Sequence, residues 1–496
     1  MGRFLFIKLL CFAFLIFRGD IVSARPLEIH PSNPRYFTDQ SGIAIYLSGS
    51  HHWYTVQDGG DQTKNVPFDY AAYLDFVKSY NHNFIRLWSW EQSAWAPWTR
   101  ERVVFAPPIY ERTGPGTALD EELKFDLSKF NKAYFDRLRS RAIDAQNKGV
   151  YVSIMLFQGW SIQKKTGRKG NPWMGHPFNG RNNINGINGD VDGDEEGTET
   201  HTLLIPSITR LQESYVRKVV DTVNDLDNVL YEISNEDPAS AENTKWQYHF
   251  INFILNYESK KQKQHPIIMT YPWPPHENNE KLFASPAHAV SPGWGGNWGS
   301  KTDDYRDDPP ASDGRKVIIV DTDHLWGVGG DHQWVWKVFL RGLNPIFMDP
   351  YTLKKYENRL DKLRFELIRK NIGYTITYSQ RINLSSMIPR NDLTSSKFCL
   401  AEPGKEYLIF MPSAGHLGIK WFDRFRLHKW LGGATKFFGW NETTIVDLAG
   451  TFGEFNVEWF NPRTGETLYT TPIAGGARRA LTSPFSGDAV LYLSKK

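Results

Sequence analysis

The sequence predicts an α/β fold, namely a (β/α)8 TIM barrel followed by a smaller all-β sandwich. The chain has 496 residues, more than one ordinary domain needs, although a barrel of roughly 250 to 400 residues would take up most of them. Between about residues 40 and 350, short β-branched runs alternate with amphipathic segments, as in repeated βα units. Beyond about residue 395, short strands are joined by turn sequences, which is typical of a sandwich.

The N-terminal stretch has the features of a secretory signal peptide. Arg3 and Lys8 accompany an apolar run that ends near Phe17, and Val22-Ser23-Ala24 supplies a small-residue cleavage site. A retained membrane anchor is the alternative, but the run is shorter than the roughly 20 residues that span a bilayer. We therefore predict a signal peptide over residues 1–24. The protein is expected to be secreted and extracellular, or periplasmic in a bacterium, with no membrane contact after cleavage.

The composition indicates a folded protein whose partner is not a polyanion. Hydrophobic residues make up 40% of the chain and charged residues 23%, which favours a buried core over disorder. The net charge of +3 is too small to predict binding to nucleic acid or to an anionic membrane. Cys11 lies in the predicted signal peptide and Cys399 is the only other cysteine, so no intramolecular disulfide is expected. The 18 tryptophans offer flat faces that suit sugar rings, although many will belong to the core.

Eight β-branched or apolar runs are predicted as the strands of the barrel, the number that a closed (β/α)8 barrel requires. They are residues 44–47, 84–88, 150–157, 229–233, 266–270, 287–290, 317–320 and 345–348. Between them, apolar residues recur at helical spacing. The clearest stripes are Tyr70, Tyr73, Leu74 and Val77, and Val216, Val219, Val220 and Val223. We assign residues 25–390 to this domain.

A long insertion, residues 163–201, follows the third predicted strand and is rich in Gly, Asn and Asp. In a barrel this position places it on the face that carries the active site. Its segment Asp190-Val191-Asp192-Gly193-Asp194 resembles the start of a calcium loop, but Glu195 stands where the loop needs glycine. We expect a solvated acidic loop, with calcium binding as the alternative, and neither a metal nor a cofactor.

The C-terminal region, residues 391–496, is predicted as the β-sandwich. A helical run over residues 360–372 precedes it, and strands are predicted at 407–411, 444–448, 455–460 and 489–493. No low-complexity linker separates the two regions, so we expect them to pack directly against each other. The protein is expected to be a monomer.

The most specific local signal is an apolar strand that ends in Ser234-Asn235-Glu236. The carboxyl end of a barrel strand delivers its side chains to the barrel mouth, where a substrate would lie. Cleavage of a glycosidic bond needs one carboxylic acid to protonate the leaving oxygen and a second carboxylate to attack the sugar or activate water. Glu236 suits the first role, and a glutamate held in a structural ion pair is the alternative.

The second carboxylate is predicted to follow the seventh strand. Asp321 and Asp323 both lie there, and the alternation of a strand would send them to the same side. We assign the catalytic role to Asp323, with Asp321 as the other candidate or as a hydrogen-bonding partner. A separation from Glu236 of roughly 5 to 5.5 Å would give retention of configuration, and roughly 6.5 to 9.5 Å would give inversion.

These motifs resemble the clan A glycoside hydrolases, which are retaining (β/α)8 enzymes. With His51-His52-Trp53, Arg86 and the terminal sandwich added, the chain looks like the apiosidase-like, cellulase-like family, in which a domain named as putatively collagen-binding follows the barrel. The resemblance implies that Glu236 is the acid/base, that Asn235 contacts a sugar hydroxyl and that Arg86 orients the nucleophile. This chain departs from the family at strand seven, where Asp323 replaces the usual glutamate.

Other polar and aromatic residues near the ends of predicted strands are candidates for contacts with a polysaccharide or glycan. They are His52, Trp53, Trp88, Gln158, Tyr271, Trp294, His324 and Trp326. His51, His52 and His324 could instead ligate zinc, but they lack a compact ligand spacing. No nucleophile elbow, phosphate-binding loop or His-Glu-x-x-His helix is present. The alternative from another functional class is a protein that binds glycans in an aromatic barrel cleft without cleaving them.

Overall fold

The computed structural model describes residues 25–60, 67–164, 170–273, 279–294, 304–352, 356, 358–413 and 441–496. The predicted signal peptide, residues 1–24, lies outside these described residues. Within them, no helix combines the length and the apolar character that crossing a membrane requires.

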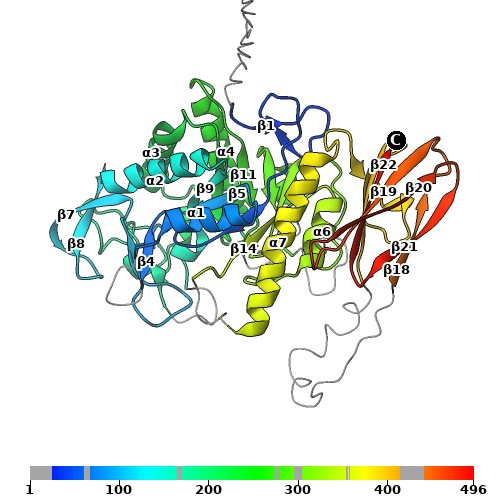
Figure 1. Cartoon of the computed structure of the whole chain (residues 1–496). Coiled ribbons are helices and arrows are strands. Elements are labelled where there is room, and N and C mark those ends of the chain that lie inside the picture. Colours follow the sequence, from blue (N-terminus) through cyan, green and yellow to red (C-terminus); the bar gives the residue numbers. More distant parts are fainter. Residues whose placement is uncertain are drawn as a thin grey trace, which may run out of the picture.

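Eight parallel strands close into a barrel, which confirms the predicted architecture (Figure 1). Each strand pairs with the next in chain order, and the last pairs with the first. The strands are β3 (Gly49–His51), β5 (Phe84–Trp88), β9 (Tyr151–Gln158), β10 (Val229–Asn235), β11 (Ile267–Thr270), β12 (Ala289–Ser291), β13 (Val317–Asp321) and β14 (Asn344–Met348). Seven of the eight predicted strands overlap an observed one.

The first barrel strand lies later in the chain than predicted. Residues 44–47 contribute only an isolated bridge, between Ile45 and Phe37, and the barrel strand is β3. A Cβ atom on Gly49 would lie 2.0 Å from the carbonyl oxygen of Phe84 on β5, so the backbones approach too closely for a side chain there. The prediction is wrong at this strand because close backbone contact selects glycine rather than a β-branched residue.

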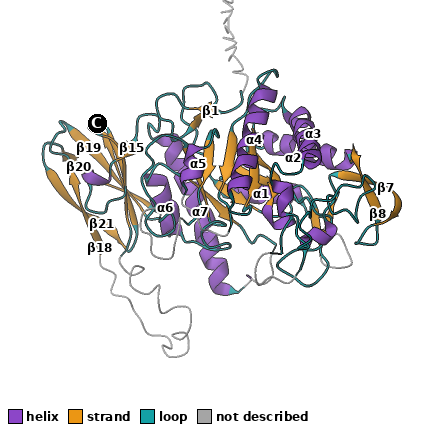
Figure 2. Cartoon of the chain, turned by 180° about the vertical axis from the view of Figure 1, so that it is seen from behind, coloured by secondary structure: helices purple, strands orange, loops and turns teal. Residues whose placement is uncertain are grey.

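Helices surround the barrel (Figures 1 and 2). They are α1 (Tyr70–Ser79), α2 (Lys132–Asn147), α3 (Pro206–Val223), α4 (Ala241–Glu258), α5 (Glu280–Ala284), α6 (His332–Leu340) and α7 (Arg359–Arg381). Both predicted apolar stripes, on α1 and α3, are buried, because one face of each helix must cover the sheet. At the amino end of the barrel, β1 (Glu28–Ile29) pairs with β2 (Phe37–Thr38), and Phe37 packs against inward-facing strand residues.

Insertions follow the carboxyl ends of β9 and β5. The predicted one, after β9, contains the 3-10 helices η1 (Gly159–Ser161), η2 (Pro172–Gly175) and η3 (Thr198–His201). The other, which the sequence analysis did not predict, follows β5. It holds β6 (Val104–Ala106), which pairs with β4 (Asp58–Gly60), and the hairpin of β7 (Tyr110–Thr117) and β8 (Leu123–Phe130). The hairpin joins the later insertion where the backbone N–H of Phe125 donates to the carbonyl of Asn182.

In its described residues, the C-terminal region forms two antiparallel sheets (Figure 1). The 3-10 helix η5 (Asn391–Leu393) connects the first two strands of the larger sheet, β15 and β16. In spatial order the larger sheet is β15 (Ile388–Pro389), β16 (Cys399–Glu402), β17 (Glu406–Met411), β22 (Ala489–Lys495), β19 (Glu454–Phe460) and β20 (Thr467–Ala474). The smaller one pairs β18 (Asn441–Asp447) with β21 (Arg478–Ser486). One face of the larger sheet shares a core with Val446 and Phe485 of the smaller one.

The opposite face of the larger sheet packs on the barrel through α6. Alternate residues of β17, Leu408 and Phe410, join the main core of the barrel. Because α6 lies between the barrel and this sheet, every residue from His332 to Leu340 is buried. The two regions therefore pack directly against each other, as the missing linker predicted.

We expect the packing between the two regions to depend strongly on Trp336 of α6. Its ring lies 6.3 Å from that of Phe410 and 6.0 Å from that of Phe460, between ring centroids, and its indole N–H donates to Asn371 at 2.7 Å. Trp336→Ala should lower the free energy of unfolding by about 3–5 kcal/mol through the cavity it leaves. Phe452→Ala, at a side chain that is 84% exposed, should change it by less than about 0.5 kcal/mol. Equal effects in urea unfolding would contradict this account of the interface.

Candidate active site

A buried arginine joins two carboxylates inside the barrel. Arg86 on β5 donates from Nε and Nη2 to the two oxygens of Glu232 on β10, at 2.8 and 2.7 Å. Its Nη1 forms an ion pair with Asp321 at the end of β13. Hydroxyls of Ser153 and Thr270 also donate to Glu232. Burial would raise the pKa of Glu232, but Arg86 and these hydrogen bonds outweigh it and hold the pKa below its usual value. Glu232 is therefore ionised.

The turn after β13 brings the two predicted aspartates together. Nε2 of His51 lies 3.1 and 3.0 Å from the oxygens of Asp321, and the backbone N–H of Asp323 donates to Asp321 at 2.8 Å. One ligand atom each of His51, Asp321 and Asp323 lies within 4.8 Å of the other two. Burial, followed by the charge of Arg86, places the pKa of His51 well below its usual value, so a neutral ring donates from Nε2. Asp321 is fully buried, whereas Asp323 is partly exposed.

Asn235, the last residue of β10, is held from both sides. Its amide nitrogen donates to Gln158 at 3.1 Å, and its amide oxygen accepts from Nε2 of His324 at 3.1 Å. The other ring nitrogen of His324 lies 3.3 Å from the Ser291 hydroxyl. Burial, and then the charge of Arg86, keep the pKa of His324 well below its usual value. A neutral His324 therefore fixes the amide of Asn235.

Glu236 follows β10 directly and sits at a strained turn. Its φ of +47° lies in the left-handed region, which residues with a Cβ rarely adopt. The indole N–H of Trp160 donates to the Glu236 carboxylate. Gly159 packs so closely on this turn that a Cβ there would lie 2.3 Å from the Glu236 carbonyl oxygen. The structure thus fixes both the backbone and the side chain of the predicted acid/base.

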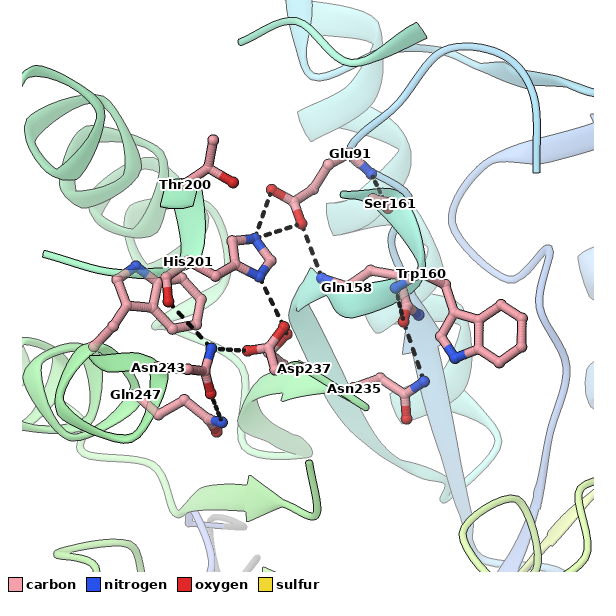
Figure 3. A network of polar contacts seen from close by, with 12 residues as sticks. Glu91, Gln158, Trp160, Ser161, Thr200, His201, Asn235, Asp237, Asn243 and Gln247 are labelled. Atoms are coloured by element: carbon pink, nitrogen blue, oxygen red, sulfur yellow. Dashed lines mark hydrogen bonds and ion pairs between the residues drawn. The ribbon is translucent and has the colours of Figure 1, made fainter. Parts of the chain in front are cut away.

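A chain of buried charged residues connects Asp237, the residue after Glu236, with His201 and Glu91 (Figure 3). Nδ1 of His201 lies 2.7 Å from Asp237, and Nε2 lies 3.1 Å from Glu91. Burial opposes the charge of His201, but the two carboxylates prevail and raise its pKa to about 10. Burial would likewise raise the pKa of Glu91, but His201 and then His176 lower it to about 2. His201 is therefore an imidazolium between two carboxylates.

Two groups of aromatic side chains lie in segments that follow barrel strands. In the first, the rings of Trp98 and Trp160 lie 6.3 Å apart between centroids, and Trp160 contacts Glu236. In the second, the guanidinium of Arg306 lies 5.5 and 5.2 Å from the rings of Trp294 and Trp326. Trp98 is 37% exposed, and the other three tryptophans are partly exposed. Each of these rings therefore keeps part of its surface open to solvent.

The structure places several predicted binding residues behind the site rather than on its surface. His52 is 1% exposed and lies among aromatic rings, with Nε2 3.0 Å from the Thr352 hydroxyl. Burial lowers its pKa to about 4. Trp88 stacks on His51 with 5.1 Å between ring centroids, and the buried Tyr271 donates to the carbonyl of Trp294 at 3.4 Å. Trp53 remains partly exposed beside the first aromatic group.

The charged residues that support the site are not among those predicted from the sequence. Glu232 carries a signal that could have found it, because it is a lone charge within an apolar strand and lies on the inward side. Asp237 is next to the predicted acid/base. Glu91 and His201 lie on two different insertions, 110 positions apart in the sequence, and no local pattern connects them.

Three acidic residues of the later insertion, Asp190, Asp192 and Glu199, also approach within 4.8 Å of one another. Asp190 accepts backbone N–H bonds from Gly193 and Glu195, and Glu199 accepts from Val191 and Asp192. These carboxylates order the turns of the loop.

Comparison with known proteins identifies the fold and leaves the family open. The family model of a domain of unknown function (DUF6298) matches residues 61–271, a segment that contains Arg86, His201 and Glu236 but ends before Asp323. No curated protein matches the chain. A solved glycoside hydrolase is 10% identical with a TM-score of 0.58, covering 95% of this chain and 97% of that one.

Two structures from Bacteroides vulgatus are similar to the same degree. A glycoside hydrolase of family 5 is 11% identical with a TM-score of 0.58, covering 95% of this chain and 94% of that one. A putative glycoside hydrolase is 12% identical with a TM-score of 0.58, covering 96% and 83%. At these identities the similarity establishes a shared fold, a TIM barrel with a C-terminal antiparallel region.

Removing the buried arginine should be strongly destabilising. Arg86→Ala leaves Glu232 and Asp321 buried without their cation, so we expect a loss of about 3–5 kcal/mol in the free energy of unfolding. Arg139→Ala is the matched control, because Arg139 forms two short bonds with Asp225 at the surface, and it should cost less than about 1 kcal/mol. Urea unfolding of both variants measures the difference, and a small effect at Arg86 would refute the assigned charge balance.

The charge on His201 should make stability depend on alkaline pH. Its pKa is raised from 6.5 to about 10 in the folded protein, so its contribution is fully present below pH 6.5 and declines as pH rises towards 10. The melting temperature of the wild type should therefore fall towards that of His201→Gln over this interval. Melting curves at successive pH values test this, and parallel curves for the two proteins would contradict it.

Proposed function

We propose that this protein is a secreted glycoside hydrolase that cleaves glycosidic bonds in an extracellular polysaccharide or glycan. The observation that carries the proposal is that Glu236 and Asp323 follow β10 and β13, two non-adjacent strands, at the carboxyl end of a closed barrel. Such an arrangement allows two carboxyl groups to act on opposite sides of one bond. The named glycoside hydrolases that share the fold and the partly exposed tryptophans support it.

In the proposed reaction the two carboxyl groups have different roles. Glu236 donates a proton to the leaving glycosidic oxygen while an oxygen of Asp323 attacks the anomeric carbon, so the bond to the leaving group breaks and a glycosyl-enzyme forms. Glu236 then removes a proton from water, which attacks the same carbon and releases Asp323. Configuration is retained because two displacements occur. We assign to Asn235 the contact with the hydroxyl beside the reacting carbon.

Asp323 suits the nucleophile better than Asp321 does. Both oxygens of Asp321 are engaged, by Arg86, His51 and the backbone N–H of Asp323, and its side chain is fully buried. Asp323 is partly exposed and can meet a ligand. Asp321 then orients the turn that carries Asp323. Arg86 forms an ion pair with Asp321, so it would act on the nucleophile through Asp321.

The acid/base role of Glu236 predicts a dependence on the leaving group. Glu236→Gln should lower kcat by about 10²- to 10⁴-fold on natural glycans, whose leaving groups need a proton. Formation of the glycosyl-enzyme from dinitrophenyl glycosides, which leave without protonation, should change much less. Asp192→Asn, on the exposed loop, is the control and should behave as wild type. Activity of Glu236→Gln that is unchanged on glycans would end the assignment.

The nucleophile is tested by chemical rescue. Asp323→Ala should lose turnover, and azide should restore cleavage of activated glycosides with formation of a glycosyl azide of inverted configuration. A panel of plant, microbial and animal glycans supplies the substrate, with products resolved by chromatography and their anomers by NMR. If the wild type gives products of inverted configuration, Asp323 would act as a general base and not as a nucleophile. Tight binding to a glycan with no product would favour the non-catalytic alternative.

A further inference from the structure

The insertion between β9 and α3 ends in His201, which contacts the turn that carries Glu236 (Figure 3). We propose that His201 is a positioning residue, an imidazolium that holds the turn Asn235–Glu236–Asp237 in the conformation that presents the acid/base. The insertion is thereby part of the site and not only a cover over it. This inference rests on the proposed role of Glu236.

The contacts of His201 require both ring nitrogens to be donors. Nδ1 lies 2.7 Å from an oxygen of Asp237, and Nε2 lies 3.1 Å from an oxygen of Glu91. Neutral histidine has one donor and one acceptor nitrogen, so one of these contacts would place a lone pair against a carboxylate. The protonated ring satisfies both contacts, and its side chain is fully buried.

These contacts close a ring around the turn. Glu91 accepts the backbone N–H of Gln158 at 2.9 Å, and the side chain of Gln158 accepts from Asn235 at 3.1 Å. On the other side of Glu236, Asp237 accepts a hydrogen bond from His201, which also donates to Glu91. The residues before and after Glu236 are thus tied to one carboxylate, that of Glu91.

The turn needs such support because its backbone is strained. The left-handed φ of Glu236 persists only where the surroundings determine it. Besides His201, the Asp237 carboxylate accepts from the Ser234 hydroxyl at 2.9 Å and from the Asn243 amide at 3.0 Å. Of these three donors, His201 alone carries a charge, and charge-assisted bonds are the stronger ones.

His201 is itself rigidly placed by α4. Its ring stacks on Trp246 with 4.4 Å between centroids and 12° between planes, which favours a cation over an aromatic face. The Asn243 amide, which binds Asp237, also donates to the carbonyl of His201 at 3.1 Å. A displaced His201 would therefore displace Asp237 as well.

The titratable groups around His201 leave it as the cation of this cluster. Asp237 faces it from the turn and Glu91 from the insertion after β5. His176 follows η2, and its Nε2 lies 3.5 Å from an oxygen of Glu91. Burial lowers the pKa of His176 and leaves the ring neutral. Among these described groups and Glu236, His201 is the only cation.

The experiment compares His201→Gln with His265→Gln. His265 is the matched control because it is also a buried histidine bound to a glutamate, with Nδ1 2.8 Å from Glu258, but it precedes β11 at the opposite end of the barrel. His201→Gln should lower kcat on glycans by about 100-fold with little change in KM, since misplacing a reacting group by about 1 Å costs that much. Its rate should also fall more steeply as the leaving group becomes more basic. His265→Gln should keep the wild-type kcat and leaving-group dependence. If both variants change kcat and the leaving-group dependence equally, His201 contributes only to general stability and the proposal is overturned.

Crystal structures and NMR separate this proposal from the proposed function. The structure of His201→Gln should show Glu236 out of the left-handed region or its carboxylate displaced, whatever the protein hydrolyses. An unchanged turn would overturn the proposal even if the wild type cleaves glycans.

Labelling the histidine rings with 15N provides a test that does not need His201→Gln to fold. Both nitrogens of His201 should stay protonated at pH 8 in the wild type, as expected from a pKa of about 10. In Glu91→Gln, whose amide oxygen still accepts from Gln158, the ring should lose its proton at lower pH. A neutral His201 ring at pH 8 in the wild type would overturn the proposal.

Discussion

The interior of the barrel is organised around one buried cation, Arg86. A guanidinium removed from water must be neutralised nearby, and Glu232 and Asp321 do this from β10 and β13, neither of which neighbours β5 in the barrel. The Ser291 hydroxyl on β12, 3.2 Å from Nη2, adds a fourth strand. The barrel must therefore close in the observed register for this charge to be satisfied, and closure sets the distance between the ends of β10 and β13.

A second layer of charges lies further towards the carboxyl end. Asp237 lies two residues after the end of β10, so the barrel strand fixes its position. His201 and Glu91 connect the turn at Glu236 to two insertions. The strained residue thus lies between two clusters in which one cation binds two carboxylates, namely Arg86 with Glu232 and Asp321, and His201 with Asp237 and Glu91. The low exposure of both clusters makes each polar contact costly to lose.

The C-terminal region contributes to the site through α6. The loop from β13 to α6 contains Asp323, His324 and Trp326, and its far end is fixed where Asp331 caps the helix. Asp488 of the larger sheet region binds His332 at 2.8 Å and Gln333 at 2.6 Å. Because the sheet covers the outer side of α6, it holds the helix that ends this loop. The packing of the two regions and the position of Asp323 are thus parts of one arrangement.

The sequence by itself determined the features that depend on local periodicity. Alternating strands and helices predicted the closed barrel, the stripes on α1 and α3 predicted their buried faces, and the strand that ends at Asn235 predicted where Glu236 lies. These succeed because the repeat of a helix or strand is written in residues that are neighbours along the chain. The tertiary structure alone decided the rest. Close backbone approach at Gly49 moved the first strand, a turn distinguished the buried Asp321 from the more exposed Asp323, and the contact of His201 with Glu91 joined two insertions. Such contacts depend on which distant segments the folded barrel brings together, and no pattern within either segment records that.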